Sequence, residues 1–195
     1  INAVKALKAQ VILFGDSYDD AYDFAKRKAK EEKLDFIHPY DDIDVIAGQG
    51  TVALEIIEQL KTKPDYIFVP VGGGGLLAGI TSYLKYESPK TKIIAVEPSD
   101  SDCFNQAFIA KKRVKLKNIG IFADGVAVKQ IGKTTFDLTR DYVSSSLLVT
   151  TDEICAGIKD LYDETRTIAE PAGALSISGI KKFIKMHNIK NKSFV

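Results

Sequence analysis

The fold is decided by the stretch Val69-Pro70-Val71-Gly72-Gly73-Gly74-Gly75-Leu76-Leu77-Ala78-Gly79. The apolar run Tyr66-Ile67-Phe68-Val69, which leads into this stretch, is typical of a buried strand. Residues 76–86, which follow the glycines, have the apolar period of a helix. Consecutive glycines let the backbone turn tightly and approach a ligand closely. Their N–H groups, together with the positive end of the following helix, predict a cradle for an anion, and a phosphate is the natural occupant.

Outward from this loop, short apolar runs alternate with longer charged segments. Buried strands are predicted at residues 11–14, 66–69, 93–96 and 144–150. Helices are predicted over residues 17–33, 49–60, 76–86 and 152–166, with a last helix from Pro171 to about His187. This alternation predicts an α/β fold with an open, twisted, mostly parallel sheet and helices on both faces.

Local signals mark where the helices begin and end. Ser17 and Thr151 are the predicted N-caps of their helices, because a hydroxyl can accept a hydrogen bond from the first turn. Pro171 suits the first turn of the last helix, and Asn188 is its predicted C-cap. The final Phe194-Val195 is expected to open another strand.

Composition excludes several classes of protein. The 195 residues are 45% hydrophobic and 27% charged, which is a globular mixture. With 27 basic and 26 acidic residues the net charge is only +1, so we expect no nucleic-acid partner. No apolar run approaches the roughly 18 residues of a membrane span, and no signal peptide opens the chain. A cytoplasmic protein without a membrane partner is expected.

The sequence leaves open which phosphate the glycine loop binds. A nucleoside-triphosphate loop of the Walker type needs Gly-Lys-Ser/Thr, but Gly75 is followed by Leu76-Leu77-Ala78. A dinucleotide loop is more tempting, because Glu97 ends the next predicted strand, where a ribose-binding acid would lie. However, the G-x-G-x-x-G pattern fits only in its looser alanine variant, from Gly73 to Ala78. A nucleotide- or phosphate-binding module without catalysis therefore remains an alternative.

Four ordered motifs carry a family resemblance. Besides the glycine loop they are Ile46-Ala47-Gly48-Gln49-Gly50-Thr51, Phe122-Ala123-Asp124-Gly125-Val126-Ala127-Val128 and Ala169-Glu170-Pro171-Ala172-Gly173-Ala174-Leu175. Together they resemble the threonine dehydratase family of fold-type II pyridoxal 5′-phosphate (PLP) enzymes, and the biosynthetic branch more than the catabolic one. The resemblance covers nearly the whole chain.

The resemblance implies a fold like that of the tryptophan synthase β subunit, with PLP held between two α/β domains. It implies that the phosphate of PLP lies on Gly72, Gly73, Gly74, Gly75 and Leu76, and that Gly125 lies beside the pyridine ring. The implied reaction converts L-threonine to 2-oxobutanoate and ammonia in isoleucine biosynthesis, by a homo-oligomer. Serine dehydration or racemization on the same scaffold is the alternative within the family.

Two further expectations follow from the resemblance. Glu97 and Asp102 lie in a segment similar to a cation-binding loop of serine racemases, although a solvated acidic loop without metal is the favoured interpretation. The family's Schiff-base lysine lies in a Ser-x-Lys-x-Arg-Gly segment, which does not occur here. Residues 1–195 are therefore expected to be a portion of the PLP-binding catalytic domain. We expect the lysine-bearing segment to lie upstream, the C-terminal regulatory domain of the biosynthetic enzymes to be absent from these residues, and no catalysis by this chain alone.

Overall fold

The computed structural model describes residues 1–195 as two compact units, Ile1–Ile37 and His38–Val195. The first unit contains α1 (Asn2–Ala6) and α2 (Tyr18–Glu32). The predicted cap of α2 is confirmed, because the Ser17 side chain accepts the Asp20 N–H and the Asp20 carboxylate accepts the Ser17 N–H. This reciprocal pair satisfies two backbone donors that the helix itself cannot satisfy.

The strand predicted at residues 11–14 is wrong. These residues form no regular structure and are mostly exposed. A strand is stable only beside a partner, and the first unit contains none. Phe14 instead stacks on Phe24 of α2, with ring centroids 4.2 Å apart.

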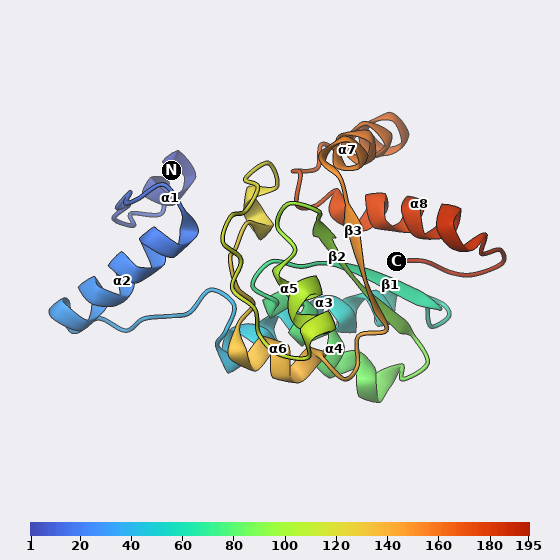
Figure 1. Ribbon diagram of the computed structural model, residues 1–195, viewed down its shortest axis with the longest axis horizontal. Helices are drawn as coiled ribbons and strands as arrows, with labels where there is room; N and C mark the ends of the chain where they lie inside the picture. Colours follow the sequence, from blue (N-terminus) through green and yellow to red (C-terminus); the bar gives the residue numbers. More distant parts are fainter. The chain divides into compact units, whose positions relative to one another are not determined.

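The second unit is built on an open parallel sheet (Figure 1). Its strands are β1 (Tyr66–Pro70), β2 (Lys92–Pro98) and β3 (Ser145–Val149), in the spatial order β1-β2-β3. Near the end of the chain Phe194 forms an isolated parallel bridge with Tyr66 on the free side of β1; the strand expected there stays a prediction. Parallel pairing places the carboxyl ends of all these strands at one edge of the sheet.

Helices cover both faces of this sheet, as predicted (Figure 1). On one face α8 (Leu175–His187) contacts all three strands, and α7 (Thr151–Thr165) packs on α8. On the other face α4 (Gly75–Glu87) contacts β1, and both α3 (Ile43–Gln59) and α6 (Lys133–Thr139) pack against α4. The remaining elements are α5 (Cys103–Ala110), which contacts β3, and a single 3-10 turn, Asp124–Val126. None of the helices has both the length and the hydrophobicity of a transmembrane span.

The core follows the two-residue period of the strands. Phe68, Ile94 and Val96 belong to one buried cluster with Leu175 and Phe183 of α8. Successive residues of a strand point to opposite faces, so the alternate positions of β1 and β2 are left for the face that α4 covers. These alternate residues are also buried: Ile67, Val69, Ile93 and Ala95. Burial on both faces explains why the strands are almost continuously apolar.

Three predicted helix boundaries need correction. Helix α3 begins at Ile43 rather than residue 49, because the Asp42 carboxylate caps it by accepting the N–H groups of Asp44 and Val45. Helix α7 is capped by Thr150 rather than Thr151, since Thr150 forms the capping box with Glu153. Helix α8 begins only at Leu175, because residues 171–174 form a turn; Asn188 is its C-cap, as predicted.

Candidate functional site

The glycine loop follows the carboxyl end of β1 and leads into α4. The backbone N–H groups of residues 72–76 donate no hydrogen bond to any other atom of the chain. The later ones belong to the first turn of α4, where the helix offers no acceptor and its dipole is positive. Gly74 has φ +90°, a backbone conformation that side chains rarely adopt. The loop therefore presents a row of donors suited to an anion.

The chain packs closely around this loop. A Cβ on Gly72 would lie 2.8 Å from Cα of Val126, and one on Gly73 would lie 2.2 Å from the ring of Tyr40. A Cβ on Gly74 would lie 2.9 Å from Oγ1 of Thr135. These positions accept only glycine, because each neighbour occupies the space of a side chain.

The carbonyl groups of the loop, unlike its N–H groups, are engaged. The Gly72 carbonyl accepts a hydrogen bond from Cys103 Sγ at 3.4 Å. The Gly73 carbonyl accepts two, from the Gly132 N–H at 3.1 Å and from Thr135 Oγ1 at 2.9 Å. The loop is thus anchored through its acceptors while its donors stay available.

One of the other sequence motifs contacts this loop, and a further motif contacts that one. Val126, in the motif that contains Gly125, lies against Gly72. A Cβ on Gly125 would lie 3.0 Å from Cβ of Ala172 and 3.5 Å from Oε1 of Glu170, both in the last motif. The Gly125 motif thus contacts both the glycine loop and the last motif, and the exposed carboxylate of Glu170 lies beside Gly125.

The two candidate metal ligands, Glu97 and Asp102, form hydrogen bonds with different groups of the protein. Glu97 is 0% exposed, and its two carboxylate oxygens accept the N–H groups of Phe104 and Asn105 at 2.8 and 2.7 Å. Burial raises the pKa of Glu97 to about 8, against the lowering effect of these N–H groups. Asp102 accepts from the side chains of Asn105 and Gln106. No group of three or more His, Cys, Asp or Glu side chains that could hold a metal ion occurs. The solvated acidic loop favoured above is wrong for Glu97, whose carboxyl group caps α5 inside the protein.

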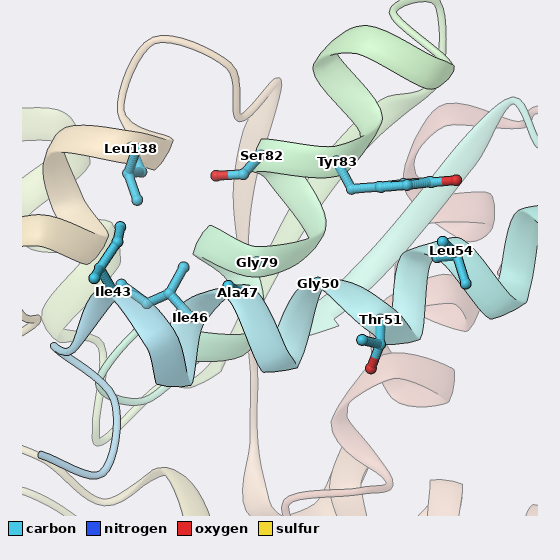
Figure 2. Close-up of a pocket in the computed structure, with 10 residues that line it drawn as sticks. All are labelled: Ile43, Ile46, Ala47, Gly50, Thr51, Leu54, Gly79, Ser82, Tyr83 and Leu138. Carbon is cyan, nitrogen blue, oxygen red and sulfur yellow. The ribbon is translucent and has the colours of Figure 1, made fainter. Parts of the chain in front are cut away.

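The motif at residues 46–51 lies in α3 and contacts α4, and it lines a pocket of about 410 Å³ rather than the glycine loop (Figure 2). Helix α6 contributes Leu138 to the same pocket. The polar side chains of its lining are Thr51, Ser82 and Tyr83, and none is charged. A pocket without cations or clustered N–H groups does not suit a phosphate, so the glycine loop remains the candidate site.

Sequence reasoning missed the side chains that support the loop, namely Tyr40, Cys103 and Thr135. Each belongs to a segment remote from the glycines in sequence, and no local pattern marks it. The Thr135 hydroxyl, for example, reaches the Gly73 carbonyl across 62 positions of the chain. Only the folded arrangement reveals these contacts.

The geometry defines an α/β protein with a loop of unpaired backbone N–H groups at the carboxyl edge of a parallel sheet. Residues 1–195 match the family described as "Pyridoxal-phosphate dependent enzyme", and the chain belongs to this family. It is 51% identical over 193 residues to "Threonine dehydratase biosynthetic, chloroplastic" of Arabidopsis thaliana, covering 99% of this chain and 33% of that protein. The chain thus spans about a third of this relative.

Two solved structures support the same assignment. The processed form of threonine deaminase isoform 2 from Solanum lycopersicum has a TM-score of 0.94 and 42% identity, covering 100% of this chain and 56% of that one. Maize serine racemase has a TM-score of 0.89 and 30% identity, covering 99% of this chain and 60% of that one. The fold expected from the resemblance is confirmed, and the cofactor of the family is PLP.

Proposed function

We propose that the whole protein is a PLP-dependent threonine dehydratase that converts L-threonine to 2-oxobutanoate and ammonia in isoleucine biosynthesis. The observation that carries the proposal is the row of N–H groups at residues 72–76, which have no acceptor within the chain. The phosphate of PLP is a small dianion that matches such a row. The likeness to the biosynthetic threonine dehydratase of Arabidopsis supports the choice of substrate.

The residues of this chain would hold and orient the cofactor. Gly72, Gly73, Gly74, Gly75 and Leu76 would donate their N–H groups to the phosphate. When bound, PLP supplies an electron sink for the carbanion formed at the α-carbon of the substrate.

Beside the phosphate, Gly125 would adjoin the pyridine ring. Its lack of a side chain, together with the packing of Ala172 against it, would leave a flat wall for the ring. Two carboxylates lie beside this wall: Asp124 accepts the Gly125 N–H at 3.0 Å, and Oε1 of Glu170 would lie 3.5 Å from a Cβ on Gly125.

Other parts of the proposal concern the protein as a whole. The covalent lysine motif of the family is absent from these residues, so we expect the chain alone to bind PLP weakly and not to turn over threonine. The domain assignment as a catalytic-domain portion, the homo-oligomeric state and the cytoplasmic location are likewise proposals. The chloroplastic Arabidopsis relative shows that proteins of this kind also work in organelles.

The test uses the purified full-length protein with PLP. We expect a visible absorbance band from the bound cofactor and threonine-dependent release of 2-oxobutanoate. Release of D-serine from L-serine, with no keto acid from threonine, would replace the proposal by the racemase alternative. Absence of the band, together with saturable binding of a nucleotide, would favour the non-catalytic module instead.

A further inference from the structure

The side chain of Asp41, just before α3, binds the start of α6, which in turn contacts the glycine loop. Its Oδ2 accepts the N–H of Lys133 at 2.9 Å, and its Oδ1 accepts those of Thr134 and Thr135 at 2.8 and 3.2 Å. These donors are the first-turn N–H groups of α6, which that short helix cannot satisfy itself. Hydrogen bonds to a carboxylate are stronger than those to a neutral acceptor, so Asp41 fixes this turn firmly.

The turn that Asp41 fixes is the one that grips the glycine loop. Gly132 precedes α6 and Thr135 lies in its first turn, and both donate to the carbonyl of Gly73. A side chain at position 132 would displace Asp41, because a Cβ on Gly132 would lie 2.5 Å from Asp41 Oδ1. Asp41, the turn and the Gly73 carbonyl therefore form one continuous chain of contacts.

Holding a carbonyl also orients the next N–H. The peptide unit is planar and trans, so the Gly73 carbonyl and the Gly74 N–H point in opposite directions. With the carbonyl held toward α6, the Gly74 N–H faces away from α6. A run of glycines would otherwise lose much conformational entropy when it orders around an anion.

We propose that Asp41 is a positioning residue for the cofactor phosphate, acting through Thr135 and Gly132 to hold the loop in its binding conformation before the phosphate arrives. This inference rests on the proposed function, since it takes the phosphate to lie on residues 72–76. Pre-ordering lowers the cost of binding without any contact between Asp41 and the ligand.

The experiment measures, in the full-length protein, how much the phosphate contributes to affinity. The dissociation constants of PLP and of pyridoxal, which lacks the phosphate, are compared in phosphate-free buffer, and their ratio is the readout. Thr135→Val removes the hydroxyl but keeps the shape, and Thr135→Ser keeps the hydroxyl. Asp41→Ala removes all three acceptor contacts, whereas Asp41→Asn keeps the Oδ1 acceptor that serves Thr134 and Thr135.

We expect Thr135→Val to reduce the preference for PLP over pyridoxal by about 2- to 10-fold, the effect of one hydrogen bond. Asp41→Ala should reduce it by at least about 10-fold, because its bonds involve a charged group. Asp41→Asn should fall between Asp41→Ala and the parent, and Thr135→Ser should match the parent. Melting temperatures identify any variant that does not fold. If Asp41→Ala does not fold, the comparison of Thr135→Val with Thr135→Ser still tests the inference.

An unchanged ratio in Thr135→Val would overturn the inference. If the affinities for PLP and pyridoxal fall equally, the ratio is unchanged and the role of the contact is merely structural. Gly74→Asp separates this failure from failure of the proposed function. If Gly74→Asp retains the phosphate preference, the phosphate does not lie on this loop, and both the proposed phosphate site and the role of Asp41 fail. If Gly74→Asp loses the preference while Thr135→Val and Asp41→Ala keep it, only the role of Asp41 is wrong.

Discussion

Gly79 of α4 lies so close to Gly50 of α3 that a Cβ on Gly79 would lie 2.5 Å from the backbone nitrogen of Gly50 (Figure 2). The same Cβ would lie 2.6 Å from the Ile46 carbonyl oxygen. The two helices therefore meet backbone to backbone, which explains why glycines are tolerated inside both of them. Since α4 begins in the glycine loop, this contact also fixes the helix that carries the candidate site.

Gly79→Ala should destabilise the protein by about 1–3 kcal/mol, because the clash involves backbone atoms that cannot rotate away. Urea unfolding measures the change. Gly48→Ala is the matched control, since nothing lies within 4 Å of a Cβ at Gly48 in the same α3. That change should stabilise the helix by roughly 0.5–1 kcal/mol. Equal effects of the two substitutions would contradict the close helix contact.

Gly74→Asp should abolish binding of the PLP phosphate in the full-length protein. The new carboxylate would repel the phosphate dianion, and φ at this position strains any side chain. Absorbance titration with PLP measures the effect. Gly48→Asp, which adds the same charge at an exposed position of α3, should leave the affinity unchanged. Normal PLP affinity in Gly74→Asp would show that the loop is misassigned.

Glu97 should make the stability of the protein depend on pH. Burial raises its pKa from 4.5 to about 8 in the folded protein. Between these two values the unfolded chain loses a proton that the folded protein keeps, so the free energy of unfolding falls as pH rises through this window and levels off above it. Urea unfolding across the window should show this slope in the parent. Glu97→Gln cannot titrate, so an undiminished slope in that variant would assign the effect to other groups.

Thr150→Ala should destabilise the protein by about 0.5–2 kcal/mol, because it removes the N-cap of α7. Thr151→Ala serves as the control, since that neighbouring threonine lies inside the helix and caps nothing. Thermal unfolding of the two variants distinguishes them. A larger loss from Thr151→Ala would restore the cap position expected from the sequence.

Features that depend on neighbouring residues could be predicted from the sequence. The strands β1 and β2 and the glycine loop are recognisable because each is a local pattern of apolar residues and glycines. The parallel sheet follows from the alternation of strands with helices, since parallel strands need a crossover connection and a helix between them supplies it. The cap at Ser17 is equally local.

Other features were decided only when remote segments came together. The pattern at residues 11–14 is that of a strand, but no partner strand lies in its unit, so the local preference is not realised. Glu97 sits in an acidic segment typical of a surface, yet it is buried because the amino terminus of α5 supplies two N–H donors for it. Asp41 reaches the amides of α6 across more than ninety positions of the chain. No sequence period encodes such contacts, because they depend on the packing of whole helices and strands rather than on the preferences of adjacent residues.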